Sequence, residues 1–241
     1  MAKTEVLVEA SGREVRITSP DKVFFPERGE TKLDLVRYYQ SLEEPVLAAL
    51  GGRPTLMQRF PDGASGKSFF QKRVGAGAPD WLQQTEVLTP NGTPSNALVI
   101  ADLAHLLWAV NMGCLGFHPW PFLAADPEVT DELRIDLDPG PGVTFDMVRE
   151  TAHEVRDLLA GEGITSYVKT SGSKGLHIFV RLLPEWNGYG VRSAAVAVAR
   201  ELERRRPDLI TAQWWKEDRG ERVFVDFNQR SEEHTSELQS R

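Results

Sequence analysis

Two carboxylates one residue apart are the strongest chemical signal in the sequence. Asp136 and Asp138 lie in the segment RIDLDP (134–139), which reads as a β-strand that ends at a proline. Residues i and i+2 of a strand point to the same face, so the two carboxylates should stand side by side while Ile135 and Leu137 face the core. Adjacent carboxylates repel unless a cation lies between them, and their hard oxygens suit Mg²⁺ or Mn²⁺. Taken alone, the pattern is a weak signal: incidental acids at a solvated strand end are its commoner explanation, and a metal site is the alternative.

A glycine-rich turn is predicted in the segment TSGSKGLH (170–177). Its two glycines permit tight turns that expose backbone N–H groups, Ser171 and Lys174 supply a hydroxyl and a cation, and His177 can donate to a phosphate. This set predicts an anion cradle. It is not a P-loop, because the GxxxxGK[ST] spacing and the following helix are missing. The plain alternative is a Gly/Ser hairpin with a structural histidine.

A third carboxylate, Asp226, interrupts the apolar segment VFVDF (223–227). An acid inside an apolar strand is costly unless it is paired or bound to a metal, whereas an acid on an edge strand can simply face water. Three aspartates and a phosphate cradle fit phosphoryl transfer with two metal ions, in which one ion activates the attacking hydroxyl and the other stabilises the leaving phosphates.

Charge is distributed unevenly along the chain. The net charge of −7 by itself argues against a nucleic-acid partner, but residues 53–73 hold five basic residues and one acidic residue, a local charge of +4. Residues 126–163 hold eleven acidic and three basic residues, a local charge of −8. A basic strip for phosphates and an acidic strip for metal ions could serve one site.

The elements that must position these residues alternate irregularly. A helix should open at the capping box of Thr31 and Asp34 and be interrupted at Pro45 before residue 50. Further helices are expected at 103–111, 145–160 and 191–206, and strands at 6–8, 15–17, 55–60, 68–73, 86–88, 98–100, 114–117, 133–137, 164–169, 176–182 and 223–227. The pattern predicts an α+β fold with mixed or antiparallel sheets flanked by helices.

Length and composition bound the class of protein. With 241 residues, 41% hydrophobic and 26% charged, the chain is an ordinary globular protein with a large core. We expect one domain over residues 1–230, with two lobes, and a non-native or disordered tail over 231–241. The single cysteine, Cys114, excludes an intramolecular disulfide, and a start without an apolar leader predicts a reducing cytoplasm. No apolar stretch approaches the roughly 20 residues needed to span a bilayer.

Several motifs together resemble the polymerase domain of bacterial ligase D, a member of the archaeo-eukaryotic primase superfamily that acts in nonhomologous end joining. The resemblance runs from about residue 17 to residue 229. It rests on the segments DLD (136–138), SGSKGLH (171–177) and VDFNQ (225–229), together with SPDKVFFP (19–26), FFQK (69–72), WAVN (108–111) and HPW (118–120). Their shared order makes the match more specific than any single motif, and it implies a two-lobed fold of the primase-polymerase type.

The resemblance implies roles residue by residue. The catalytic, metal-binding carboxylates would be Asp136, Asp138 and Asp226, holding two Mn²⁺ or Mg²⁺ ions. The residues that bind the incoming nucleotide would be Ser171, Lys174, His177, Phe70 and His118, the last near the ribose 2′-hydroxyl. The DNA-binding residues would be Lys22 and Lys32, which grip the 5′-phosphate across a gap, with Phe69, Arg59 and Lys72. Stacking on an aromatic face is independent of base identity, which suits a template-directed enzyme. Without the motifs, these phenylalanines would read equally well as core, the two lysines as ordinary surface residues, and the histidine as structural.

Two departures from the family pattern stand out. Ser19 takes the place of an asparagine common in the family's 5′-phosphate pocket. Family members also continue past the last strand with a basic segment that helps to hold the triphosphate, where this sequence has SEEHTSELQSR (231–241).

The sequence thus predicts a template-dependent nucleotidyltransferase that adds nucleotides, preferably ribonucleotides, to a DNA 3′-hydroxyl during double-strand-break repair. Expected partners are DNA ends or gapped duplex with a 5′-phosphate, NTPs or dNTPs, and the proteins Ku and a separate DNA ligase. The expected location is the bacterial cytoplasm, associated with the nucleoid. Two alternatives remain open: a metal-dependent nuclease or phosphohydrolase, and a catalytically inert module that binds DNA ends.

Overall fold

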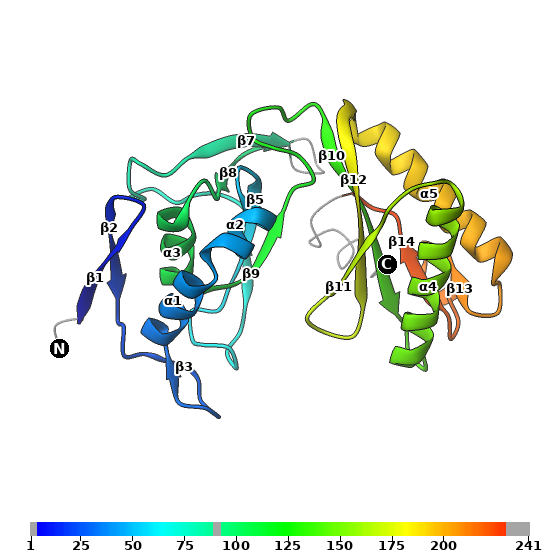
Figure 1. The fold of residues 1–241 in the computed structure, drawn as a ribbon. Helices are drawn as coiled ribbons and strands as arrows, with labels where there is room; N and C mark the ends of the chain where they lie inside the picture. Colours follow the sequence, from blue (N-terminus) through cyan, green and yellow to red (C-terminus); the bar gives the residue numbers. More distant parts are fainter. Residues whose placement is uncertain (1–3, 89–92, 230–241) are drawn as a thin grey trace. The chain divides into compact units, whose positions relative to one another are not determined.

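The computed structural model describes residues 4–88 and 93–229, which form two compact units with a boundary between Ala125 and Asp126 (Figure 1). Each unit has its own hydrophobic core. The predicted domain, residues 1–230, therefore contains two units, and the predicted tail at 231–241 lies outside the described residues.

The first unit combines hairpins, helices and one larger sheet. Its strands are β1 (Glu5–Ala10), β2 (Arg13–Thr18), β3 (Val23–Phe25), β4 (Glu30–Thr31), β5 (Pro54–Arg59), β6 (Phe69–Gln71), β7 (Gln84–Leu88), β8 (Pro94–Val99) and β9 (Cys114–Pro119). Its helices are α1 (Lys32–Ser41), α2 (Glu43–Leu50) and α3 (Leu103–Asn111). The larger sheet has the order β6-β5-β8-β7, with β9 also paired to β5. Almost every side chain of α3 is buried, which makes this helix the centre of the first core.

The break between α1 and α2 lies at Leu42, so the predicted interruption at Pro45 was wrong in position. Pro45 instead occupies the first turn of α2, where a helix has no partner for its backbone N–H and a proline costs little. The predicted capping box is confirmed: the Thr31 hydroxyl accepts from the backbone N–H of Asp34, and the Asp34 carboxylate accepts from the backbone N–H of Thr31.

The second unit is a five-stranded sheet with two long helices. Its elements are β10 (Thr130–Pro139), α4 (Phe145–Gly161), β11 (Tyr167–Thr170), β12 (Leu176–Trp186), α5 (Gly188–Arg205), β13 (Ile210–Thr211), a 3₁₀ turn (Lys216–Asp218) and β14 (Val223–Asp226). The strand order is β11-β12-β10-β14-β13, antiparallel throughout except for the parallel pair β13–β14. This mixed architecture confirms the predicted α+β class.

One face of this sheet is covered by helices, and the other is covered only in part, around β14, where Phe224 and Asp226 are buried. Figure 1 shows α4 and α5 on the same side of the sheet, and their buried residues join one core with alternate residues of the strands, among them Ile135, Leu137 and Ile178. Because side chains alternate along a strand, the intervening residues, including Asp136 and Asp138, lie on the opposite face. The sheet thus separates a hydrophobic face from a polar one.

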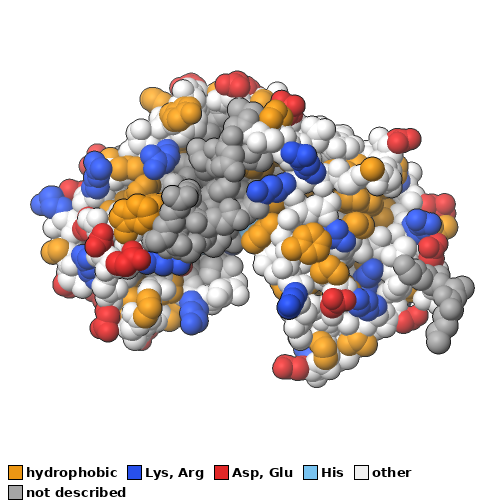
Figure 2. All heavy atoms as spheres, turned by 180° about the vertical axis from the view of Figure 1, so that it is seen from behind, with side chains coloured by type: hydrophobic (Ala, Val, Ile, Leu, Met, Phe, Trp, Pro, Cys, Tyr) orange, Lys and Arg blue, Asp and Glu red, His pale blue; other side chains and the backbone are white. Residues whose placement is uncertain are grey.

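The sequence analysis did not predict three of the shortest strands. Strands β3, β4 and β13 have only two or three residues, too few for alternation to show, and the strand expected from residue 164 begins at Tyr167. Within the described ranges, no helix is long and apolar enough to cross a membrane. Figure 2 shows basic and acidic side chains interspersed on the face seen from behind. The acidic side chains therefore form no single patch on that face.

The capping box of α1 gives a test of the first unit. Thr31→Ala removes the hydroxyl that accepts from the backbone N–H of Asp34, and we expect it to lower the free energy of unfolding by about 1 kcal/mol. Urea denaturation followed by circular dichroism measures the change. Thr31→Ser, which keeps the hydroxyl, is the control; an equal loss in both variants would show that the cap does not contribute.

Candidate active site

The predicted catalytic residues lie in a row across the sheet face of the second unit that α4 and α5 do not cover. In the strand register, Asp136 on β10 is opposite His177 on β12 and also opposite Asp226 on β14. Residues directly opposite each other on antiparallel strands share a face, so all three side chains point the same way. Asp138 lies on that face two residues further along β10. The structure therefore brings together carboxylates that are 90 residues apart in sequence.

Asp226 is buried despite its charge. Its strand lies between β10 and β13, and the residue is 5% exposed, which excludes the alternative of an edge-strand acid facing water. The pKa of Asp226 is raised to about 6, chiefly by burial and also by the charge of Asp138. The backbone N–H of Asn228, which donates at 2.8 Å, and the charge of Arg219 oppose this rise. The groups around Asp226 thus offset only part of the cost of its ionised form.

The donor chemistry fits divalent metal ions. Three carboxylates share one face, and the raised pKa of Asp226 shows that a nearby cation would stabilise its ionised form. Hard oxygen ligands of this kind suit Mg²⁺ and Mn²⁺. Within the described residues, however, no three side chains of His, Cys, Asp or Glu are already gathered as a ligand set, so ion binding would have to draw the carboxylates together.

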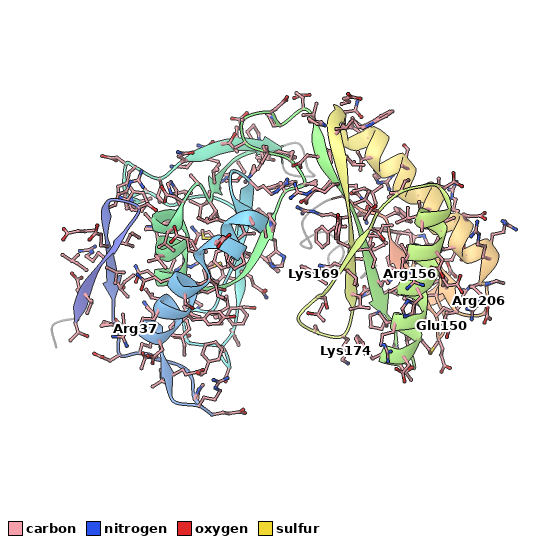
Figure 3. The ribbon with its side chains drawn as sticks, in the orientation of Figure 1. Arg37, Glu150, Arg156, Lys169, Lys174 and Arg206 are labelled. Carbon is pink, nitrogen blue, oxygen red and sulfur yellow. The ribbon has the colours of Figure 1, made fainter. Side chains whose placement is uncertain are left out.

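The predicted anion cradle is a tight turn between β11 and β12. The Ser171 hydroxyl accepts from the backbone N–H groups of Ser173 (3.3 Å) and Gly175 (3.1 Å), and Gly172 has a φ of +88°, which favours glycine. Lys174 is exposed on this turn (Figure 3). Ser171 therefore holds the shape of the turn, a role in addition to the phosphate contact predicted for it.

Two features connect the turn to the carboxylates. A Cβ atom on Gly175 would lie 2.5 Å from the backbone oxygen of Leu137, so only glycine lets the turn approach β10 this closely. His177 follows at the start of β12, and its Nε2 lies 3.5 Å from Oδ1 of Asp136. The predicted nucleotide-binding residues of this unit thus adjoin the predicted catalytic residues.

Arg219 is a site residue that the sequence analysis missed. Its guanidinium lies 3.5 Å from the centre of the Phe224 ring and donates to the backbone oxygens of Gln213 and Trp214. Phe224 is opposite Asp138 in the register. Burial lowers the pKa of Arg219, and the charges of the nearby acids oppose that change. Arg219 lies in an irregular segment without a motif, so no sequence signal identified it.

The two lysines predicted to grip a 5′-phosphate are neighbours in the first unit. The backbone N–H of Lys32 donates to the backbone oxygen of Lys22, whose own N–H donates to the oxygen of Ser19. Lys22 is half-exposed, with its Nζ 3.5 Å from Oδ1 of Asp62. Lys32 is only 7% exposed, and its Nζ donates to the backbone oxygens of Thr18 and Asn111. The reading of Lys32 as an ordinary surface lysine is therefore wrong, and its role on DNA stays a prediction.

Phe69 and Phe70 point to opposite sides of β6. Phe69 is 46% exposed and lies under the guanidinium of Arg59, 5.3 Å from the ring centre. Phe70 makes an edge-to-face contact with His118, with 5.4 Å between the ring centres. Neither phenylalanine belongs to the buried core, which excludes the reading of both as core residues. The stacking roles of Phe69 and Phe70 and the ribose contact of His118 stay predictions.

A pocket of about 960 Å³ in the first unit gathers most of the predicted DNA-binding residues. Its lining includes Arg59, Phe69, Phe70 and Lys72. Arg59 is held in place because it donates to the backbone oxygen of Met112 (2.7 Å) and to the side chain of Gln71. Aromatic rings beside cations are the combination that binds single-stranded nucleic acid.

Gly175 gives a first test of this site. We expect Gly175→Ala to lower the free energy of unfolding by about 2 kcal/mol, because the added methyl group forces the turn away from β10. Urea denaturation measures the change. Gly161→Ala is the matched control, since a Cβ atom there meets nothing within 4 Å. Equal stability of both variants would contradict the close approach.

Asp226 gives a second test, through pH. The folded carboxyl binds its proton more tightly than the unfolded one, so the contribution of Asp226 to stability falls as the pH rises from about 4 to about 6. Relative to the unmodified protein, Asp226→Asn should gain about 3 kcal/mol across this window, because a shift of one pKa unit is worth about 1.4 kcal/mol. Unfolding free energies measured from pH 4 to pH 7 test this. A difference between the two proteins that does not change with pH would refute the raised pKa of Asp226.

Comparisons with known proteins support the resemblance seen in the motifs. The multifunctional non-homologous end joining protein LigD of Mycolicibacterium smegmatis is 36% identical over 224 residues, which cover 92% of this chain and 29% of that protein. The bifunctional LigD of Bacillus subtilis is 32% identical over 222 residues, covering 92% of this chain and 35% of that protein. The chain thus spans about a third of the length of these relatives.

A solved structure and a family match agree with these relatives. The polymerase domain of Mycobacterium tuberculosis ligase D, solved in complex with DNA, superposes with a TM-score of 0.82 at 34% identity, covering 89% of this chain and 77% of that chain. The family described as LigD, primase-polymerase domain, matches residues 31–237. Because this match covers most of the chain, the protein belongs to the LigD primase-polymerase domain family.

Proposed function

We propose that the protein is a template-dependent nucleotidyltransferase that adds nucleotides, preferably ribonucleotides, to a DNA 3′-hydroxyl during break repair by end joining. The observation that carries this proposal is the row of His177, Asp136 and Asp226, with Asp138 beside it and a glycine turn at its end, on one sheet face. Family membership supports a polymerase role for such a face.

Asp136, Asp138 and Asp226 would hold two divalent ions, Mn²⁺ or Mg²⁺. Bound there, such ions lower the pKa of the primer hydroxyl and neutralise charge that develops on the phosphates. The protein's own contribution is to keep the three carboxylates on one face of a sheet, from which ion binding would draw them together.

The residues of the glycine turn would orient the triphosphate. Ser171 holds the shape of the turn by accepting from the backbone N–H groups of Ser173 and Gly175. Lys174 would add a flexible cation, and His177 can donate from its ring to a phosphate oxygen. Since these groups adjoin the carboxylates, they would position the reacting phosphate there and stabilise the charge on the departing pyrophosphate.

The first unit would supply the DNA contacts. Lys22 and Lys32 would bind a 5′-phosphate as point charges, which requires no base identity. Phe69 and Phe70 would stack on bases, with Arg59 and Lys72 on phosphates, and His118 would contact the ribose 2′-hydroxyl. The relative from Mycobacterium tuberculosis was solved with DNA, which supports a DNA substrate here. Ku and a separate DNA ligase are the protein partners that we propose.

Asp138 tests the catalytic role. We expect Asp138→Ala to lower primer extension at least about 100-fold, since one of the carboxylates proposed to hold the ions is lost, while DNA-end binding stays largely intact. Gel assays of extension and fluorescence anisotropy of end binding measure the two properties. Asp146→Ala, which removes an exposed acid on α4, is the control. An equal loss of extension and binding in Asp138→Ala would count against a metal-binding role.

Lys22 is a better test of the DNA contact than Lys32, because it is half-exposed whereas Lys32 is almost fully buried. The loss of Lys22 removes one bond to a backbone oxygen, that of Pro61, and the loss of Lys32 removes two. On gapped DNA, we expect Lys22→Ala to reduce the preference for a 5′-phosphate over a 5′-hydroxyl about fivefold, the value of one charged contact at a half-exposed position. Competition binding with the two DNAs gives this ratio. Lys67→Ala, an exposed lysine of the same unit, should leave it unchanged. If Lys22→Ala keeps the preference, the residue does not contact the 5′-phosphate.

A single assay separates the proposed function from its alternatives. Labelled primer–template is incubated with Mn²⁺ and either NTPs or dNTPs. Extension, faster with NTPs, is the expected result. Shortening without extension would instead identify a nuclease, and end binding that survives Asp136→Ala without any extension by the unmodified chain would identify an inert binding module.

A further inference from the structure

The row of His177, Asp136 and Asp226 extends to a lysine on the edge strand β11. In the register, Lys169 is opposite His177, which is opposite Asp136, which in turn is opposite Asp226. Opposite residues on antiparallel strands share a face, so the order across this face is lysine, histidine, aspartate, aspartate. The sequence analysis did not identify Lys169, which lies outside the motifs. Its pairing with His177 is visible only in the strand register.

We propose that Lys169 binds the triphosphate of the incoming nucleotide, at the phosphates that depart as pyrophosphate. This inference rests on the proposed function. Neighbouring strands lie about 4.8 Å apart, so the backbone of Lys169 is roughly 10 Å from that of Asp136 and roughly 5 Å from that of His177. If the reacting phosphate lies over the carboxylates, the rest of the triphosphate extends past His177 towards Lys169.

The surroundings of Lys169 suit this role. All four residues of β11 are exposed, and the Nζ of Lys169 donates to the backbone oxygen of Thr170 at 3.1 Å. A phosphate is a stronger acceptor than a carbonyl oxygen, so the flexible side chain can exchange one for the other. Lys169 and Lys174 are both labelled in Figure 3, one on the strand and the other on the turn that follows it. The two lysines would therefore bind the triphosphate from different elements.

The test compares nucleotides that differ only in their phosphates. Titration of the unmodified chain with ATP, ADP and AMP in the presence of Mn²⁺ gives three dissociation constants. We expect Lys169→Met, which keeps the length of the side chain but removes its charge, to weaken ATP binding about tenfold and to leave AMP binding unchanged. Lys169→Arg should retain ATP binding. In primer extension, Lys169→Met should raise KM for ATP with kcat little changed, because the contact exists before and during the reaction.

Arg181→Met is the matched control. Arg181 lies on the same face of β12, four residues and about 13 Å from His177, and it is likewise exposed. This variant removes the same charge and should bind ATP as the unmodified chain does. Equal effects of Lys169→Met and Arg181→Met, or equal losses for ATP and AMP, would overturn the proposal, as would a failure of the unmodified chain to bind ATP.

The two proposals fail in different ways. ATP binding that depends on Lys169, in a chain that extends no primer, would refute the polymerase function and keep this inference. Primer extension that is indifferent to Lys169→Met would refute the inference and keep the function.

Discussion

The burial of negative charge at the end of β14 is the constraint on which the second unit's polar face depends. Asp226 is almost fully buried beside the charge of Asp138, and burial is the largest cause of its raised pKa. Arg219 and the backbone of Asn228 offset part of that cost. In the proposed function this burial has a purpose, because a divalent ion bound beside Asp226 would offset the cost of its charge.

The hydrophobic face of the sheet holds this arrangement in place. Alternate residues of β10, β12 and β14 pack under α4 and α5 in a continuous apolar core, so the strands cannot slip in register without moving those residues to the polar face. The same constraint fixes which residues stand opposite one another in the polar row. Packing on one side of the sheet therefore determines the chemistry on the other.

The basic side chains of the first unit differ in how firmly the fold encloses them. Lys32 and Arg59 are held by backbone oxygens of other segments, and their charge also stabilises the fold. Lys22 and Lys72 are less enclosed. A lysine that is almost fully buried and bonded to three acceptor atoms cannot be distinguished in sequence from one on the surface, because the difference lies in Thr18 and Asn111, which come from distant segments.

The sequence alone was sufficient for the α+β class, most of the longer elements, the capping box at Thr31 and the family, because local periodicity and short motifs carry that information. Alternation along β10 also predicted the shared face of Asp136 and Asp138. Tertiary structure alone decided the rest: the burial of Asp226, the contribution of Arg219, and the pairing that sets Lys169 in the row. These depend on strand order and register, which arise from contacts between segments far apart in the chain and leave no local pattern in the sequence.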